Sequence, residues 1–526
     1  MKSSKSNAMK TTQRVIILGI DSLDPVLINQ YLQFLPNIRK LIKDTPELHL
    51  NSIFPVDSIP AWVSIFTGQN PANHGIVKTF DVFDNSVGIG LLNDVKKIQG
   101  KTFWDYLAKE GKRTVLFCPL MAFPPWDVNG LMVSKGIVDI DIQTMNAWNI
   151  QRELLVYPPD KRDTYNIPLF LNGISGKHPG THNLLSWSDD AKYALEEEFK
   201  LCNTLMQKEE WDLFFAYFSS LDIICHRFWR FSDPCDPTFP GHTSFENVIK
   251  DFYIVFDTII GKILDNNPDS SLIILSDHGH GRRPTKVVNI NSIIRENSLY
   301  YPNKEKIHYI NFILEKFKTG FLGVVNRLEL DFWLVSFSTR STKLSEMSKN
   351  VYSSQSLSKK SKYVAKLSPF AGLKSYPHGG IEICSEELKD SEYENIREKI
   401  IDLLRQAKDP NSCELLMDWV LKREQLYNGK FVSEVYPDIV FKLKEEYGTG
   451  WNIYPPLISN ANDHNLASGG HKSAAVLILK NVKRSLNRND ATIMDIAPTI
   501  LDLMDIDPTR YPFDGKSLFQ PGDTDS

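Results

Sequence analysis

Short runs of apolar residues alternate along this chain with longer stretches in which apolar positions recur at helical spacing. Four runs rich in β-branched and aromatic residues end abruptly at polar residues, at positions 15–20, 213–218, 272–275 and 475–479. Stretches between them, such as 191–205 and 393–406, have the pattern of amphipathic helices. Continuous apolar strands that alternate with such helices predict an α/β fold, with a parallel sheet covered on both faces. In such sheets the functional groups gather at the carboxyl ends of the strands.

Two stretches interrupt this alternation. Residues 124–183 carry the clusters PPWD, YPPD and HPG, which predict irregular loops over the rim of the sheet, on the substrate side. Residues 303–368 begin with the helical pattern IHYINFILEKF and end near the polar segment SSQSLSKKSKY, which predicts a cap. We therefore expect a single catalytic domain over residues 14–526 with two insertions, preceded by a flexible polar segment at 1–13.

The composition narrows the class of partner. A chain of 526 residues with 42% hydrophobic residues can bury a large core. Charged residues make up 24% of the chain and the formal net charge is only -4. A chain with so little net charge has no strong electrostatic attraction to a nucleic-acid polymer or an anionic membrane, so a small-molecule substrate is expected. The first apolar run, VIILGI, is too short for a membrane span, and no signal peptide is predicted.

The six cysteines are scattered and include no CxxC pair, which argues against a structural zinc site or a disulfide scaffold. We expect these thiols to be reduced and mostly buried, and the protein to be cytoplasmic. No pattern in the chain predicts an oligomeric state.

Candidate chemistry begins with Asp21 and Ser58. Asp21 follows the first predicted strand, where a carboxylate is commonly just a cap or turn residue. Ser58 precedes Pro60 and the helical run AWVSIF, so it is predicted to be the N-cap of a helix. That position also presents free backbone N–H groups to an anion such as a phosphate. A serine nucleophile there would need a base or a metal ion to lower the pKa of its hydroxyl.

Asp222 and His226 follow the apolar run LFFAYF at a spacing of i, i+4. If a helix begins there, both side chains lie on one face of it. A carboxylate and an imidazole one turn apart match the ligand preference of zinc, although a helix-start Asp with a packed His has the same pattern.

Asp277 and His278 follow the predicted strand at 272–275 and lead into a glycine-rich segment. We predict a turn there, made possible by Gly279 and Gly281, that would let both side chains reach one metal ion. His471 lies at the entry of the last predicted strand, and taken alone it is an ordinary packed histidine.

Taken together, these segments supply three carboxylates, three imidazoles and one hydroxyl, most of them beside predicted strands. Such a set could hold two divalent ions, each with about three protein ligands and an open position for substrate. The residues are Asp21, Ser58, Asp222, His226, Asp277, His278 and His471.

The order and wording of the segments resemble the alkaline phosphatase superfamily, in its type I phosphodiesterase and nucleotide pyrophosphatase branch. The resemblance covers nearly the whole chain, through GIDSLDP, PVDSIPAWVSIFTGQNPANHGI, FFAYFSSLDIICHRFW, LSDHGHG, YPDIVFKL, GGHKSAAVLIL and MDIAPTILDLMDID. It implies a three-layer α/β sandwich with a mostly parallel central sheet and cap insertions. It also implies two divalent ions, with Zn²⁺ expected and Mn²⁺ as the alternative.

The resemblance further implies how the ligands divide. Asp222, His226 and His471 would bind one zinc ion. Asp21, Asp277 and His278 would bind the second, together with the oxygen of Ser58. Ser58 would be the nucleophile, at a position where the diesterase branch commonly has Thr.

One segment departs from the family pattern. Similar diesterases usually have an Asn shortly after the HGI motif, where it binds a phosphoryl oxygen. This chain has Lys78 and Thr79 there, and we predict that they take part in substrate binding.

With these residues, the resemblance implies a two-step hydrolysis of phosphodiester or pyrophosphate bonds through a phosphoserine intermediate. A sulfatase is excluded because no cysteine lies near Ser58. A phosphomonoesterase, a phosphomutase or a phosphonate hydrolase would use the same ligands, so these remain alternatives. A catalytically silent metal-binding scaffold is the alternative from another class.

Overall fold

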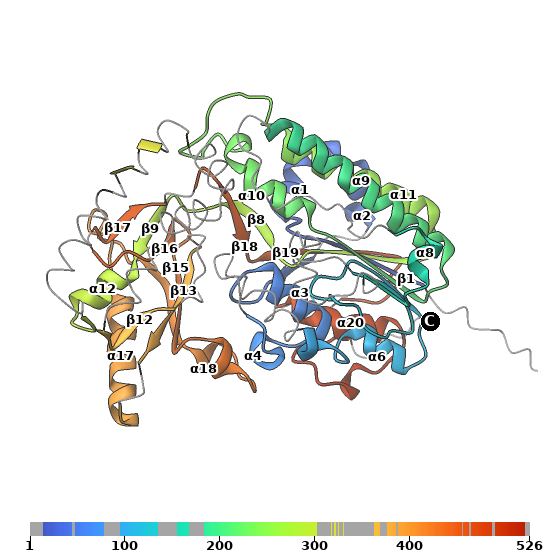
Figure 1. The fold of residues 1–526 in the computed structure, drawn as a ribbon. Helices are drawn as coiled ribbons and strands as arrows, with labels where there is room; N and C mark the ends of the chain where they lie inside the picture. The colour runs from blue at the N-terminus through green and yellow to red at the C-terminus, as the bar shows by residue number, and fades with distance from the viewer. Residues whose placement is uncertain are drawn as a thin grey trace, which may run out of the picture.

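The computed structural model describes most of the chain. The described residues are 14–44, 48–77, 95–134, 155–167, 184–301, 317, 320–321, 324–325, 330, 362–368, 376–384, 388–454, 456–461, 464–486 and 490–520. They form a large lobe around an eight-stranded sheet and a smaller lobe of mostly antiparallel strands (Figure 1).

The large sheet has the strand order β2-β19-β7-β1-β6-β3-β4-β5. Its strands are β1 (Val15–Ile20), β2 (Leu48–Asn51), β3 (Thr114–Phe117), β4 (Gly130–Val133), β5 (Val156–Tyr157), β6 (Leu213–Phe218), β7 (Ser271–Leu275) and β19 (Ala474–Lys480). Neighbouring strands from β7 through β1, β6 and β3 to β4 are parallel. Strand β19 is antiparallel to both of its neighbours, and β5 is antiparallel to β4. The sheet is therefore mostly parallel, as the family resemblance implies.

Helices cover both faces of this sheet (Figure 1). One face packs against α1 (Pro25–Tyr31), α2 (Pro36–Asp44), α9 (Leu184–Lys208), α10 (Ser220–Ser232) and α11 (Val248–Asn266), and the other against α3 (Ser58–Thr67), α6 (Phe103–Lys109) and α20 (Ile496–Leu503). Side chains of β1 alternate between the two cores: Ile16 and Leu18 belong to the first, Val15 and Ile17 to the second. A strand with both faces buried reads as a continuous apolar run, which is why the sequence pattern located these strands.

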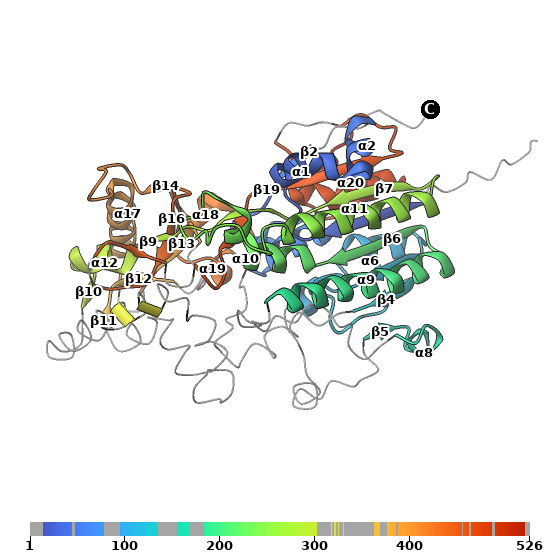
Figure 2. The same cartoon turned by 90° about the horizontal axis from the view of Figure 1, so that it is seen from above.

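The smaller lobe is built on a four-stranded antiparallel sheet of order β12-β13-β15-β14. It consists of β12 (Ala365–Leu367), β13 (His378–Ile383), β14 (Met417–Lys422) and β15 (Ile439–Leu443), with α17 (Asp390–Gln406) packed on it. Beside it lies the sheet of β9 (Lys286–Asn289), β16 (Tyr447–Gly450) and β17 (Ile458–Asn460). The sequence pattern did not predict these sheets. Figure 2 shows the smaller lobe beyond one end of the large sheet.

Short elements complete the described fold. A two-stranded ribbon of β8 (Gly279–Arg282) and β18 (Gly469–Lys472) lies where the lobes meet. The remaining elements are α4 (Pro71–His74), α8 (Lys161–Thr164), α12 (Ile290–Glu296), α18 (Arg423–Leu426), α19 (Val432–Val435), β10 (Tyr300–Tyr301), β11 (Lys362–Tyr363) and three short 3-10 helices, η1 (Leu32–Phe34), η4 (Ile493–Asp495) and η5 (Pro508–Arg510).

The two predicted insertions have different outcomes. Within 124–183, the prediction of irregular loops is wrong for β4 and β5, because these segments form strands of the large sheet. Most of 303–368 lies outside the described residues, so the predicted cap stays a prediction.

No helix in the described ranges combines the length and apolar character needed to cross a bilayer. The described cysteines are all free, but only Cys118, Cys202 and Cys225 are buried. The prediction of mostly buried thiols is therefore wrong for Cys235, Cys384 and Cys413, which are exposed and lie outside the large sheet. The cytoplasmic location stays a prediction.

Candidate metal centre

The direction of four strands brings the predicted residues to one edge of the large sheet. Asp21 follows β1, Asp277 follows β7, and Asp222 lies at the start of α10, directly after β6. These strands are parallel neighbours, so their carboxyl ends meet at the same edge. Because β19 runs in the opposite direction, the residues that precede it reach this edge as well. His471 arrives there on β18, a separate short strand, and not at the start of β19 as the sequence predicted.

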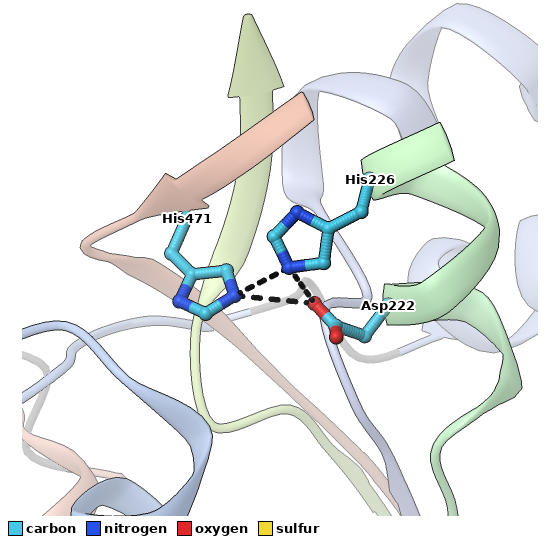
Figure 3. Close-up of side chains that lie close together, drawn as sticks. All are labelled: Asp222, His226 and His471. Atoms are coloured by element: carbon cyan, nitrogen blue, oxygen red, sulfur yellow. Dashed lines mark hydrogen bonds and ion pairs between the residues drawn. The ribbon is translucent and has the colours of Figure 1, made fainter. Parts of the chain in front are cut away.

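Asp222, His226 and His471 point toward one another (Figure 3). The Nε2 atoms of both imidazoles lie 3.3 Å from Asp222 Oδ1 and 3.0 Å from each other. Nδ1 of His226 lies 2.9 Å from the carbonyl oxygen of Gly469, and Nδ1 of His471 lies 3.1 Å from that of Val56. A carbonyl oxygen can only accept a hydrogen bond, so each ring carries its proton on Nδ1 and presents a bare Nε2 to the centre of the group.

Asp21, Asp277 and His278 form a second group, which is fully buried. His278 Nε2 lies 3.2 Å from Asp277 Oδ2 and 3.8 Å from Asp21 Oδ1. Asp277 Oδ2 accepts no hydrogen bond in the described part of the structure. In each group one donor atom from every residue lies within 4.8 Å of the others, which is compact enough for a shared metal ion.

Two aromatic side chains orient Asp21. The hydroxyl of Tyr217 donates a hydrogen bond of 2.6 Å to Asp21 Oδ2, and Trp62 Nε1 donates one of 3.2 Å to the same oxygen. Asp21 Oδ1 is thereby turned toward Ser58 and His278. Such outer contacts fix the direction in which a ligand atom points.

Ser58 lies beside the second group. Its Oγ is 3.3 Å from Asp21 Oδ1 and 3.1 Å from His278 Nε2. The prediction that Ser58 is the N-cap of its helix is wrong, because Asp57 caps α3 with its side chain on the backbone N–H of Ile59. Ser58 is the first residue of the helix, so its hydroxyl is free for contacts within the site.

Comparison with known proteins supplies the family. A family model described as type I phosphodiesterase / nucleotide pyrophosphatase matches residues 15–448. This chain belongs to that family. Membership supports the hydrolysis of phosphate esters as its chemistry. Comparison with curated protein sequences gives no match.

Two solved structures of distant proteins are similar to this family member over most of their length. A phosphonoacetate hydrolase from Sinorhizobium meliloti 1021, in complex with phosphonoformate, is 14% identical, with a TM-score of 0.50 over 94% of this chain and 95% of that one. Murine ectonucleotide pyrophosphatase / phosphodiesterase 5 is 13% identical, with a TM-score of 0.47 over 96% of this chain and 98% of that one. The first likeness confirms the alkaline-phosphatase-like fold.

The electrostatics of the site suit a family whose chemistry is metal-dependent. Burial and the nearby charge of Asp222 raise the pKa of Asp21 to about 7, and burial with the charge of Asp21 raises the pKa of Asp277 well above its usual range. Burial would raise the pKa of Asp222 too, but positive charge on His226 and His471 holds it well below its ordinary value in the metal-free site, and a cation bound there would supply that charge with both rings neutral. Burial keeps the pKa of His278 well below its usual value, so this ring is neutral.

A divalent cation fits this donor set. Several carboxylates buried at one place repel one another unless a positive charge compensates them. Neutral imidazoles with bare nitrogens and a carboxylate oxygen without a hydrogen-bond donor are the ligand states that metal ions require. The described residues of this family member therefore provide two suitable metal-binding groups.

The two glycines after His278 have a different role from the predicted one. Gly279 and Gly281 lie in strand β8, not in a turn. A Cβ on Gly279 would lie 2.4 Å from Asp24 Oδ2 and 2.5 Å from the carbonyl oxygen of Ala474. Gly279 thus allows β8 to pack closely against Asp24, and Gly281 leaves room for the Lys472 side chain of the paired strand β18.

Four further residues either lie outside the described structure or were not predicted from the sequence. Lys78 and Thr79 lie outside the described residues. The sequence interpretation missed Ser22 and His280, whose side chains lie among the metal-binding groups. Both occur within the segments DSLD and DHGHG that carry predicted ligands, and their proximity to those ligands in the sequence was the available signal.

Proposed function

We propose that this protein hydrolyses phosphodiester or pyrophosphate bonds with two bound divalent metal ions and Ser58 as the nucleophile. One observation carries the proposal: the Ser58 hydroxyl lies at the start of a helix and within 3.3 Å of both Asp21 Oδ1 and His278 Nε2. A nucleophile next to a metal-binding group and a helix N-terminus is suited to attack on an anionic phosphate.

The two groups would each hold one ion. One set consists of Asp222, His226 and His471, and the other of Asp21, Asp277 and His278 with the oxygen of Ser58. Zn²⁺ is the expected ion because both sets combine imidazole nitrogen with carboxylate oxygen, and Mn²⁺ is the alternative. When bound, such ions lower the pKa of a coordinated hydroxyl and stabilise negative charge on phosphate oxygens.

The protein's own groups perform two displacements. In the first, Ser58 Oγ forms a bond to phosphorus as the bond from phosphorus to the leaving oxygen breaks, and the serine proton leaves with the departing group. In the second, the oxygen of water bonds to phosphorus, the bond from phosphorus to Oγ breaks, and a proton from that water restores the Ser58 hydroxyl. The first turn of α3, where Asp57 caps the N–H of Ile59, adds the positive end of the helix dipole beside Ser58, which favours an anionic phosphate in both steps. Lys78 and Thr79 are our candidates for contacts to a phosphoryl oxygen.

Chromogenic phosphate esters test this proposal. Purified zinc-loaded protein is expected to cleave bis(4-nitrophenyl) phosphate faster than 4-nitrophenyl phosphate, because the proposed substrate is a diester. A preference for the monoester by several orders of magnitude would contradict the diesterase assignment. No turnover of diesters, monoesters or pyrophosphates by fully zinc-loaded protein would favour the metal-binding scaffold. Parallel loading with Mn²⁺ tests the choice of ion.

A further inference from the structure

Ser22 lies between the two metal-binding groups and contacts both. Its Oγ donates a hydrogen bond of 2.7 Å to Asp222 Oδ1 and lies 3.2 Å from His278 Nδ1. Its backbone N–H donates to Asp277 Oδ1 at 3.4 Å. The same Oγ lies 3.0 Å from Nδ1 of His280, a residue of strand β8. Ser22 is fully buried, so these contacts replace hydration.

The proton positions in this network follow from the chemistry of its members. A serine hydroxyl has one proton, and Asp222 as a carboxylate can only accept it. The oxygen of Ser22 then accepts from His280 Nδ1 and shares the Nδ1 proton of His278 with the carbonyl oxygen of Gly279, which lies 3.1 Å from that nitrogen. This state leaves His278 Nε2 bare, facing the second group. His280 Nε2 is also bare, in agreement with its lack of a hydrogen-bond partner in the described structure.

The backbone of Ser22 is in a conformation that favours glycine. Its φ of 63° lies in the left-handed region, which costs a residue with a Cβ roughly 1 kcal/mol. The neighbouring Asp24 attaches this segment to strand β8, because its Oδ2 accepts a hydrogen bond of 3.1 Å from the backbone N–H of His280. Strain at a buried polar residue beside a reaction centre points to a role for its side chain.

We propose that Ser22, supported by His280, is a positioning residue that couples the two metal-binding groups. Its hydroxyl fixes the direction of Asp222 Oδ1 in one group and, together with the carbonyl oxygen of Gly279, the orientation of the His278 ring in the other. The inference rests on the metal binding in the proposed function and adds a residue outside the ligand set. Loss of the hydroxyl is therefore expected to weaken the binding of both ions.

Zn²⁺ titration of the metal-free full-length chain tests the coupling, with calorimetry or a competing chelator as readout. Ser22→Gly removes the hydroxyl and relieves the strained backbone, which offsets part of the cost of leaving its buried partners without that hydrogen bond, and the unfolding temperature of the metal-free variant verifies that it folds. Both Zn²⁺ binding steps should nevertheless weaken by about 10- to 100-fold, as is usual for outer contacts of metal ligands. Ser22→Ala should weaken them similarly.

The control is Ser220→Ala. Ser220 is a buried serine at the start of α10 whose hydroxyl has no hydrogen-bond partner in the described structure, so its loss should leave Zn²⁺ affinity unchanged. Wild-type affinity for both ions in Ser22→Gly would overturn the inference, and weakening of one step alone would overturn the coupling. A wild-type chain that binds no Zn²⁺ would contradict the proposed function itself.

A pair of variants tests the part played by His280. His280→Asn keeps an N–H near the position of Nδ1 and should retain most of the Zn²⁺ affinity, whereas His280→Leu removes the donor and should lower it. Equal affinities for the two variants would show that His280 does not support Ser22.

Discussion

At the scale of single residues, the chemistry of the site depends on which side-chain atoms are already hydrogen-bonded. Tyr217 and Trp62 occupy one oxygen of Asp21, and a backbone carbonyl binds Nδ1 of His226. The remaining oxygen and nitrogen are thereby aimed at the places where an ion would lie. The sequence identified Asp21 and His226 as candidates, but it could not show which of their atoms are occupied, because those partners are distant in the chain.

Substitution of Ser58 by alanine separates chemistry from metal binding. Ser58→Ala removes the proposed nucleophile, so turnover should fall by about a thousandfold or more. Zinc content should stay nearly unchanged, because the group beside Ser58 keeps Asp21, Asp277 and His278. Activity assays and metal analysis on the same preparation measure both quantities, and retained turnover would refute the assignment of the nucleophile.

The raised pKa of Asp21 predicts a pH-dependent stability of the metal-free protein. The pKa of Asp21 is about 7 in the folded protein, compared with its ordinary value of 3.8. Between these values the folded state binds more protons than the unfolded state, so this contribution to stability is present at low pH and is lost as the pH rises toward 7. Its size is on the order of a few kcal/mol.

Asp21→Asn provides the comparison, because the amide cannot ionise. In chelator, the unfolding temperature of the wild type should fall relative to that of Asp21→Asn as the pH is raised from about 5 to about 8. Buried histidines stabilise the folded state as the pH rises, and they are present in both proteins. The difference in unfolding temperature between the two proteins therefore removes their contribution. Parallel pH profiles of the two proteins would show that Asp21 does not titrate in this range.

At the scale of elements, the site depends on strand direction. The apolar runs predicted β1, β6, β7 and β19 because each strand is buried on both faces. Such a run does not indicate whether the strand is parallel or antiparallel to its neighbours. The ribbon of β8 and β18 consists of Gly, His, Arg and Lys, so no apolar pattern marked it as strand. Its pairing brings His471 opposite His280, which only tertiary structure decides.

A buried hydrogen bond between His464 and Asp236 attaches the segment before β18 to the loop after α10. His464 Nε2 lies 2.9 Å from Asp236 Oδ2, and both side chains are buried. Burial alone would raise the pKa of Asp236, yet the hydrogen bonds from His464 and Thr238 lower it. His464→Ala leaves the buried carboxylate of Asp236 without the hydrogen bond from this ring and should reduce the free energy of unfolding by about 3 kcal/mol.

Denaturant unfolding measures this effect, and an exposed pair serves as the control. His242 Nδ1 lies 2.9 Å from Glu246 Oε2, but the His242 side chain is 92% exposed. His242→Ala should therefore change stability by less than about 0.5 kcal/mol. Equal effects of the two substitutions would contradict a stabilising role for the buried pair.

At the scale of the whole molecule, the proposed site lies at the edge of the large sheet that faces the smaller lobe (Figure 2). Tyr376, just before β13, packs its ring 5.2 Å from that of His471 and 5.4 Å from that of His378. The smaller lobe thus contacts a candidate ligand directly. The sequence did not predict the sheets of the smaller lobe. Their strands are spread along the chain between residues 286 and 460, and several of them have only partly apolar patterns.

The zinc content per chain tests the central claim, that seven residues from distant segments form a two-metal centre. Elemental analysis of zinc-loaded protein should give two ions per chain for the wild type and one for His471→Ala, which removes a ligand from the first group only. Absence of bound zinc in the wild type, or an unchanged zinc content in His471→Ala, would contradict this account of the site.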